Sequence, residues 1–399
     1  MPQNDGWRRE GKQRDVDAEG FFAKLVAQQH YQGGLAHEQG GRWAEALEAY
    51  RAACDGDPQV SLYWLARGTA AQRQRQWDEA ARAYREALAL APADPVVLYN
   101  QALLFLAQGQ RQPARRNLEA VLRLKGERLG DRAAQVHARL GDLALQDEDY
   151  LVAEAHLRQA LVRKPDDPYA TAALHALPRL REFAAPYDQD GRLPAKIGIY
   201  AYCGALLLGL PGDDGITIPA GRTGRLDGHA AVAAVLRRVA DTVLAFRWRF
   251  DTLVPLDAPA WPLTLALAHT LGIPAVRWPQ SLQGGTVLAL AVTVTETGES
   301  DHAARVAQEH SDAALLVALG LHGRPWQVRP QPHVLCVPTT VTLPWAADAA
   351  ATASDDQVLG RTLSDLTARQ PPDETAVRQR AWSREHCRLR FDLERFRGP

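Results

Sequence analysis

Cysteine is scarce in this sequence, and its few residues lie far apart. The four positions are Cys54, Cys203, Cys336 and Cys387, with no Cys-x-x-Cys pair among them. Neither a disulfide framework nor a zinc site is indicated, because both need regularly spaced cysteines. We expect reduced thiols with a structural role.

A long apolar run is missing as well. No window approaches the ~20 apolar residues that a membrane helix needs. The first twenty residues are polar and charged where a secretory signal would need an apolar stretch. The sequence therefore predicts a cytoplasmic protein that does not bind membranes.

An excess of charge of one sign is absent too. Lysine and arginine together number 46 against 47 acidic residues, so the formal net charge is −1 and the pI about 6.9. This balance argues against a broad nucleic-acid or membrane-binding surface, although local patches stay open. At 399 residues, the chain is long enough for two or three domains.

What the sequence does contain is a repeat in its first half. The segments RWAEALEAYRAACDGDP (residues 42–58) and QWDEAARAYREALALAP (residues 76–92) place the same residue types in the same order, 34 residues apart. The offset also relates Gly34 to Gly68 and Tyr50 to Tyr84. Small residues at such positions let two helices approach closely, and a proline ends each unit.

This pattern resembles the tetratricopeptide repeat, a helix pair with a period of 34 residues. The resemblance implies an all-α solenoid over residues 21–185, preceded by a polar tail at residues 1–20. The predicted repeats are residues 27–60, 61–94, 95–128 and 134–167, followed by a capping helix at residues 169–183. Four stacked units are enough for a continuous core.

In such a solenoid the first helix of each repeat lines a concave face, where the family usually binds its partners. The matching positions are Tyr31, Leu35, Leu62, Leu65, Thr69, Tyr99, Leu103 and Leu106. This apolar and aromatic set suits an amphipathic helix of a protein partner. The family's clamp for a carboxylate is not expected, since only Arg73 and Asn100 lie nearby. The alternative is that these residues are solenoid core or are covered by the second half of the chain.

The second half, residues 186–399, has a different pattern. Apolar runs with strand character alternate with amphipathic segments of helical period, for example strands at residues 250–257, 285–292 and 312–321. Alternation of this kind predicts an α/β domain with a mainly parallel sheet. The fold class is therefore an all-α solenoid followed by an α/β domain.

Residues 241–321 resemble the core of type I phosphoribosyltransferases in the order of their elements. The resemblance rests on a strand that ends in Val-Pro, a helix, the turn Leu271–Pro274, a Gly-Thr-Val strand and a Thr-Gly loop that opens a helix. It implies a site for phosphoribosyl pyrophosphate beyond the carboxyl ends of the strands. Backbone N–H groups of the Thr-Gly loop would then hold a phosphate.

The residues that this chemistry needs are altered. The two adjacent acids that hold the ribose fall on Val292 and Thr293. Two carboxylates, Glu296 and Glu299, lie inside the loop, where they would repel an anion. After the first core strand, residues 257–262 carry prolines and a tryptophan in place of small residues. We therefore expect a non-catalytic domain. The residues that remain for a phosphate are Thr297, Gly298 and Ser300, and a plain turn is the alternative.

No other pattern for chemistry stands out. The histidines do not pair with cysteine or acids at metal-ligand spacing, so we expect no metal, no cofactor and no catalytic residue. The arginine-rich tail at residues 378–398 is interpreted as a surface helix whose aromatic side packs inward, and residues 347–356 as a loop.

Taken together, these features lead us to expect an adaptor that binds proteins. The alternative is a phosphoribosyltransferase-like enzyme or a sensor of a small phosphorylated ligand.

Overall fold

The structure is a computed structural model. It describes residues 6–125, 131–190, 192–210, 212–214, 218, 224–277, 282, 284–298, 300–325, 327–328, 331–345, 353–387 and 396. The chain forms two compact units: Met1–Leu145 with Gln159–Pro165, and Gln146–Arg158 with Asp166–Pro399.

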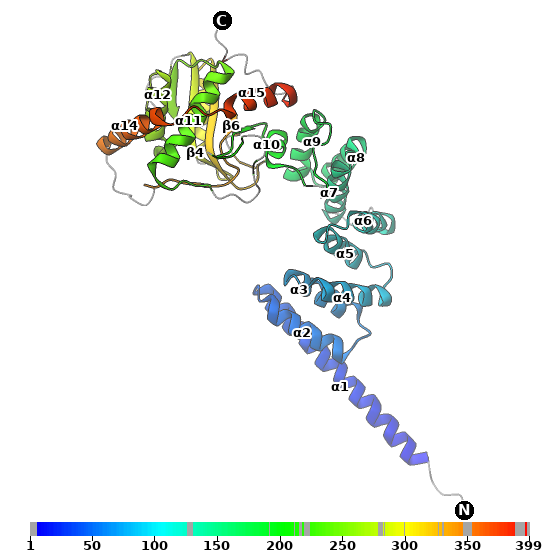
Figure 1. Cartoon of the computed structure of the whole chain (residues 1–399). Coiled ribbons are helices and arrows are strands. Elements are labelled where there is room, and N and C mark those ends of the chain that lie inside the picture. Colours follow the sequence, from blue (N-terminus) through cyan, green and yellow to red (C-terminus); the bar gives the residue numbers. More distant parts are fainter. Residues whose placement is uncertain are drawn as a thin grey trace, which may run out of the picture. The chain divides into compact units, whose positions relative to one another are not determined.

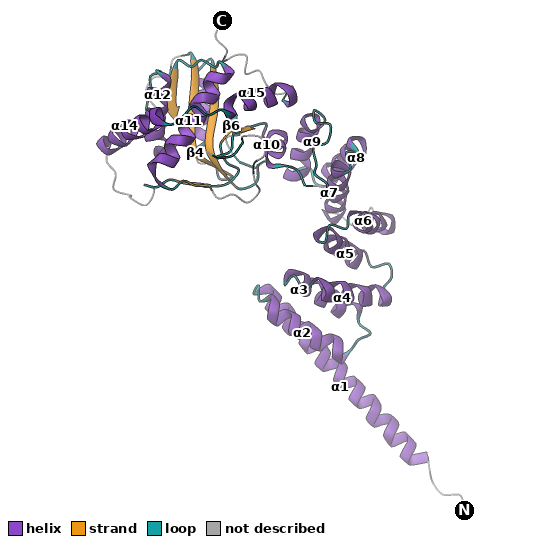
Figure 2. Cartoon of the chain, viewed as in Figure 1, coloured by secondary structure: helices purple, strands orange, loops and turns teal. Residues whose placement is uncertain are grey.

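Paired helices build the first part of the chain (Figures 1 and 2). Their bounds are α1 (Gly6–Gln39), α2 (Trp43–Gly56), α3 (Ser61–Arg73), α4 (Trp77–Leu90), α5 (Pro95–Ala107), α6 (Arg111–Lys125), α7 (Asp131–Gln146), α8 (Tyr150–Arg163) and α9 (Pro168–Leu180). In the first unit α1 packs against α2, α3 against α4 and α5 against α6. This is the helical solenoid that the sequence predicted.

Local sequence explains where several of these helices begin. Asp94 caps α5, because its side chain accepts hydrogen bonds from the backbone N of Val96 and Val97 at 2.7 and 3.3 Å. Asp167 caps α9 in the same way through Ala170 N, at 2.9 Å. In both helices a proline takes the first position, where no backbone N–H is needed.

Glycine allows the helices of each repeat to meet closely. A Cβ added to Gly34 of α1 would lie 2.4 Å from Cε1 of Tyr50, and one added to Gly68 of α3 would lie 2.5 Å from Cε1 of Tyr84. Both tyrosine side chains are fully buried. The repeated Gly and Tyr of the sequence are therefore one contact, present in two consecutive units.

This contact predicts opposite effects for two adjacent glycines of α1. Gly34→Ala should lower the stability of the first repeat by about 1–3 kcal/mol, because its methyl group would collide with the Tyr50 ring. Gly33→Ala should raise it by roughly 0.5–1 kcal/mol, since nothing lies within 4 Å of the new Cβ and alanine favours helix. Hydrogen exchange of peptides from α2 measures both. Equal protection in the two variants would contradict the predicted collision.

An ion network joins the first two repeats. Glu79 of α4 accepts hydrogen bonds from Arg51 of α2, including one from Nε at 2.8 Å, and from Nε of Arg67 of α3 at 2.9 Å. The hydrogen bonds from Arg51 are the main reason why the pKa of Glu79 falls to about 2. The glutamate therefore stays ionised in the half-buried contact between the repeats.

Two expected boundaries differ from the structure. Helix α1 begins at Gly6, so most of the expected polar tail is a helical extension of the first repeat. Helix α9, expected as the cap of the solenoid, belongs to the second compact unit. The reason is its contact with α10 (Ala195–Cys203), where Nη1 of Arg179 donates to the carbonyl O of Ala201 at 2.8 Å.

The centre of the second unit is a parallel five-stranded sheet in the order β1-β6-β5-β4-β3. Its strands are β1 (Leu206–Leu207), β3 (Thr252–Pro255), β4 (Thr286–Thr295), β5 (Ala313–His322) and β6 (Val334–Leu335). A separate parallel pair consists of β2 (Gly224–Arg225) and β7 (Val341–Thr342). The predicted mainly parallel sheet is confirmed, whereas the two-residue strands were not predicted.

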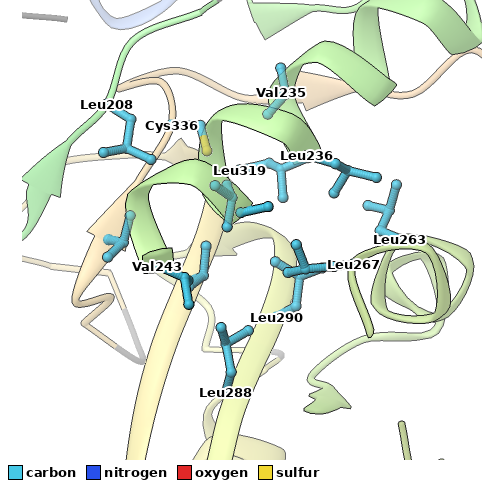
Figure 3. Packing of buried hydrophobic residues seen from close by; sticks show 14 of the residues in the cluster. Leu208, Val235, Leu236, Val243, Leu263, Leu267, Leu288, Leu290, Leu319 and Cys336 are labelled. Atoms are coloured by element: carbon cyan, nitrogen blue, oxygen red, sulfur yellow. The ribbon is translucent and has the colours of Figure 1, made fainter. Parts of the chain in front are cut away.

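Helices cover both faces of the sheet. The helices are α11 (Gly228–Phe246), α12 (Trp261–Leu271), α13 (Asp301–Glu309), α14 (Ala353–Arg369) and α15 (Thr375–His386), with a short 3-10 turn η1 (Ala258–Ala260) before α12. On one face α11, α12 and α14 close the larger core, in which Leu236, Leu267 and Leu290 meet (Figure 3). On the other face α10 and α13 contribute to a smaller core.

None of the helices among the described residues has the length and apolar character needed to cross a bilayer.

The sequence predicted a loop at residues 347–356. Residues 347–352 of this segment lie outside the described residues. From Ala353 onward the same segment is the start of α14. The sequence prediction of a loop was wrong for those last residues, because Asp355 and Asp356 occupy the first turn of a helix, where acidic side chains are favourable.

Candidate functional site

The eight residues predicted for the concave face lie on three helices of the first unit. Tyr31 and Leu35 are on α1, Leu62, Leu65 and Thr69 on α3, and Tyr99, Leu103 and Leu106 on α5. These eight residues are called the groove face below. As expected from the repeat, every one belongs to the first helix of its unit.

The residues of the groove face differ in exposure. Leu62 is 49% exposed, and the other seven are partly buried. Tyr31 packs its ring 5.0 Å from that of Tyr63 and 5.8 Å from that of Tyr50, and Leu65 packs on the core of the first two repeats. Within the first unit, the groove face therefore combines side chains that pack on the core with the exposed side chain of Leu62.

A cavity of about 400 Å³ opens beside α3 and α5. Thr69 and Leu103 of the groove face line it together with Arg73, Arg75 and Asn100. Asn100 Nδ2 lies 3.5 Å from Thr69 Oγ1, which links the two helices across the cavity. The cavity therefore combines an apolar wall with amide and guanidinium donors.

Two arginines give this cavity its positive charge. The guanidinium of Arg73 lies 5.2 Å from the centre of the Trp43 ring, which supports it through a cation–π contact. Arg75 follows in the turn after α3, with a left-handed φ of 58°. Among the described residues neither arginine forms an ion pair. Sequence reasoning noted Arg73 and Asn100 but missed Arg75, because a turn residue does not follow the helical periodicity.

The predicted phosphate loop follows β4 and is held by bonds within the protein. Gly298 adopts a φ of 71°, and its N lies 3.4 Å from the carbonyl O of Thr295. Oγ1 of Thr297 lies 2.7 Å from Oγ1 of Thr295, and Asp301 N donates to Gly298 O at 2.9 Å. Ser300 is 4% exposed, at the start of α13. Thr297, Gly298 and Ser300 thus form a strand-to-helix turn whose N–H groups at Gly298 and Asp301 point to local carbonyls.

Of the two carboxylates in the loop, Glu299 lies outside the described residues, whereas Glu296 has a structural partner, as does Asp257 nearby. Glu296 Oε1 accepts a hydrogen bond from Arg324 N at 2.6 Å, which ties the end of β4 to the loop after β5. Asp257, after β3, accepts from Ala260 N at 2.8 Å and from Val292 N at 2.9 Å. Both side chains hold neighbouring backbone segments. Within the described part of the chain, no group of three or more His, Cys, Asp or Glu residues is placed to hold a metal ion.

Comparison with known proteins identifies the repeats. Two family models described as tetratricopeptide repeat match the chain, one at residues 61–94 and the other at residues 30–61 and 99–168. The chain therefore contains tetratricopeptide repeats, as its 34-residue offset predicted. No curated protein sequence matches significantly.

Several solved structures are similar to part of the chain. A complex of the Yersinia enterocolitica type III secretion chaperone SycD with a peptide of the translocator YopD is 21% identical and covers 30% of this chain and 93% of its own, with a TM-score of 0.29. Pseudomonas aeruginosa PilF is 18% identical and covers 54% of this chain and 84% of its own, with a TM-score of 0.37. The first repeat domain of Spaghetti (RPAP3), bound to an HSP90 peptide, is 19% identical and covers 29% of this chain and 94% of its own, with a TM-score of 0.27.

Proposed function

We propose, from the tetratricopeptide repeats in its first half, that the protein is a cytoplasmic adaptor that binds a partner protein along the groove face. Two observations carry this proposal: Leu62 is exposed, and Thr69 and Leu103 of the same groove face line a cavity beside α3 and α5. An adaptor needs a surface that the protein's own core does not fill, and Leu62 and the cavity offer such a surface within the first unit.

The chemistry of the groove favours one kind of occupant. Leu62, Leu65 and Leu103 offer apolar contacts, while Arg73 and Arg75 offer positive charge at the cavity. An amphipathic helix with apolar anchors one turn apart and an acidic side chain near one end fits both features. Peptide complexes of similar repeat structures, with YopD and with HSP90 peptides, agree with a peptide partner.

The α/β domain is included in this proposal as a non-catalytic part. The positions of the two ribose-binding acids carry Val292, which is 8% exposed, and Thr293, whose Oγ1 lies 3.4 Å from Val341 N. Glu296, the nearest carboxylate along the chain, and Asp257, which follows β3, are engaged in backbone hydrogen bonds. These contacts support a domain of phosphoribosyltransferase-like order that has lost the transfer reaction.

The proposal predicts which substitutions abolish partner binding. Leu65→Arg combined with Tyr99→Arg should reduce the partner recovered with the immobilised full-length protein at least about tenfold, because two cations would enter an apolar contact. Leu62→Arg, at the most exposed position, should act in the same direction without disturbing the core. Quantitative mass spectrometry of the copurified proteins measures the loss.

A matched control is Leu124→Arg, which changes a leucine of similar exposure, 45%, at the end of α6. This variant should recover the partner as the unchanged protein does. Circular dichroism should show the same helical content in all variants. If Leu62→Arg and the double variant both recovered as much partner as the unchanged protein, the binding surface would lie outside the groove face.

A further inference from the structure

The cavity beside α3 and α5 differs in charge from the rest of the groove face. The described residues that line it include two arginines, Arg73 and Arg75, and two side-chain amides, Gln72 and Asn100, but no acid. Both arginines are exposed residues, so a ligand can reach them. The volume of about 400 Å³ lies within the range of pockets that hold small ligands.

The two arginines have no acidic partner. Neither forms an ion pair with a residue in the described part of the chain. Asp78 and Glu79 follow soon after them in sequence, but neither lines the cavity, and Glu79 is already bonded to Arg51 and Arg67. Two cations that share one cavity without a counter-charge attract an anion.

The backbone of Arg75 provides an independent observation. Its φ of 58° is left-handed, a conformation that glycine adopts without strain and other residues seldom adopt. At offsets of 34 residues the same turn holds Gly41, with φ 70°, and Gly109, with φ 73°, and in the fourth repeat it holds Glu148. The guanidinium of Arg75 has no hydrogen bond within the described part of the chain that would offset this strain. Backbone strain without an internal reward is typical of binding sites.

The amides of the cavity have donors to offer. Tyr84 is fully buried, and its OH donates to Oε1 of Gln72 at 2.8 Å, which leaves the N–H groups of that amide. Nδ2 of Asn100 lies 3.5 Å from Oγ1 of Thr69, at the upper limit of a hydrogen bond. A better acceptor in the cavity would therefore replace a weak contact.

The cavity is continuous with the apolar part of the groove face. Thr69 and Leu103 belong to both. On α3, Leu65 lies one helical turn before Thr69, and Leu62 lies two turns before it. A peptide whose apolar side chains rest on these leucines can therefore place a neighbouring side chain in the cavity, whereas a free phosphate or nucleotide would leave the leucines unused.

From this arrangement we infer that the cavity receives a phosphoserine of the partner peptide, so that phosphorylation of the partner controls its binding. This inference rests on the proposed adaptor function. A phosphate monoester carries nearly two negative charges at neutral pH and three terminal oxygens, which match two guanidinium groups and the amide donors beside them. A carboxylate, with one charge and two oxygens, would leave one of the two cations without a partner.

Peptide libraries with one fixed central residue test this inference on the immobilised full-length protein. The central residue is phosphoserine in the first library, serine in the second and glutamate in the third, with the same degenerate flanks in all three. We expect the phosphoserine library to bind at least about tenfold more tightly than the serine library, because charge-assisted contacts to two arginines are added. The glutamate library should bind more weakly than the phosphoserine library.

Arg75→Gly is the decisive variant, and it should abolish the preference for phosphoserine. Glycine suits the left-handed φ and occupies the same turn at Gly41 and Gly109, so the variant should fold at least as well as the unchanged protein. Arg85→Gln is the matched control, because it changes an exposed arginine of α4 that does not line the cavity. The inference is overturned if Arg75→Gly keeps the preference, or if the serine or glutamate library binds as tightly as the phosphoserine library.

Phosphatase treatment of the native lysate separates this inference from the adaptor function. We expect recovery of the partner by the unchanged protein to fall at least about tenfold after treatment. Equal recovery from treated and untreated lysates, with loss in Leu62→Arg, would overturn the phosphoserine site and leave the adaptor function standing. Recovery that Leu62→Arg does not change would contradict the adaptor function, and the libraries would still decide on the phosphoserine site.

Discussion

Replacing Arg238 with methionine is expected to lower the free energy of unfolding of the α/β unit by about 3–5 kcal/mol. The Arg238 side chain is 4% exposed on α11. Its Nη1 donates to the carbonyl O atoms of Leu208 and Leu210 at 3.2 and 2.5 Å, and its Nη2 donates to that of Asp213 at 3.1 Å. Its Nε pairs with Asp373. Methionine would fill much of the volume while leaving these buried acceptors without donors.

The Asp373 carboxylate would be affected most. Burial alone would raise its pKa, but hydrogen bonds from Arg238 and Thr375 outweigh burial and hold the pKa below the usual value. Without the guanidinium, the carboxylate would be a partly buried charge with only Thr375 as a donor. We therefore expect the loss in the Arg238→Met variant to be larger near neutral pH than in mild acid, where Asp373 can be protonated.

Hydrogen exchange of peptides from α11 measures this effect within the unit, independently of the repeats. The matched control is Arg237→Met at the adjacent position, which breaks a more exposed pair with Asp241 at 2.9 Å. The control should cost less than about 1 kcal/mol. Similar losses in both variants would show that Arg238 contributes no more than a surface ion pair.

Stability of the α/β unit is also expected to rise by about 2 kcal/mol between pH 7 and pH 9 because of Lys196. This lysine of α10 is 3% exposed, and burial lowers its pKa to about 7 from the ordinary 10.5. In the unfolded chain Lys196 would still bind its proton in that pH range. The unfolded state therefore holds more protons than the folded state, and raising the pH favours folding.

The surroundings of Lys196 fix the ammonium group in place. Nζ donates to Leu207 O at 3.2 Å and to Gln379 of α15, and it lies 4.6 Å from the centre of the Trp382 ring. Cys387 and Asp214 favour its charged form, and Arg238 disfavours it. Burial outweighs the two favourable neighbours.

Urea unfolding followed by tryptophan fluorescence at pH 7, 8 and 9 measures the effect. Lys196→Met should give a flatter dependence on pH, because it removes the titrating group, and the difference between the two proteins isolates the contribution of Lys196. Parallel pH profiles would contradict a depressed pKa at this position. The two proteins are compared by the pH dependence of their stability and not by its absolute value, because Lys196→Met also leaves the acceptors of Gln379 and Leu207 without a donor.

The repeats could be predicted from sequence because each depends on residues that are close along the chain. Gly34 meets Tyr50 and Gly68 meets Tyr84 at the same short separation, so a single offset revealed both contacts. The longer strands β4 and β5 were predictable for a similar reason, since each is a continuous apolar run buried on both sides. Strands β1 and β6 pair over only two residues, too few for any periodicity.

The α/β unit also has a cavity lined by four arginines, and it could not be predicted in the same way. Arg247 and Arg249 lie in a turn, and Arg380 and Arg384 lie on a helix that follows much later in the chain. Only the contact of α11 with α15 brings them together. The sequence showed an arginine-rich tail, but the acids interspersed in it suggested a solvated helix. The pairing of Glu79 with Arg51 and Arg67 is similarly a product of tertiary contact.

The strand order of the sheet has a bearing on how the protein is made. Strand β1 pairs only with β6 among the described strands, and β6 leaves the ribosome after every other strand of that sheet. Each helical repeat, by contrast, finds its partner within the next few dozen residues and can close while translation continues. We therefore expect the nascent chain to close its helical repeats first and to carry β1 without its partner strand until synthesis has passed Leu335.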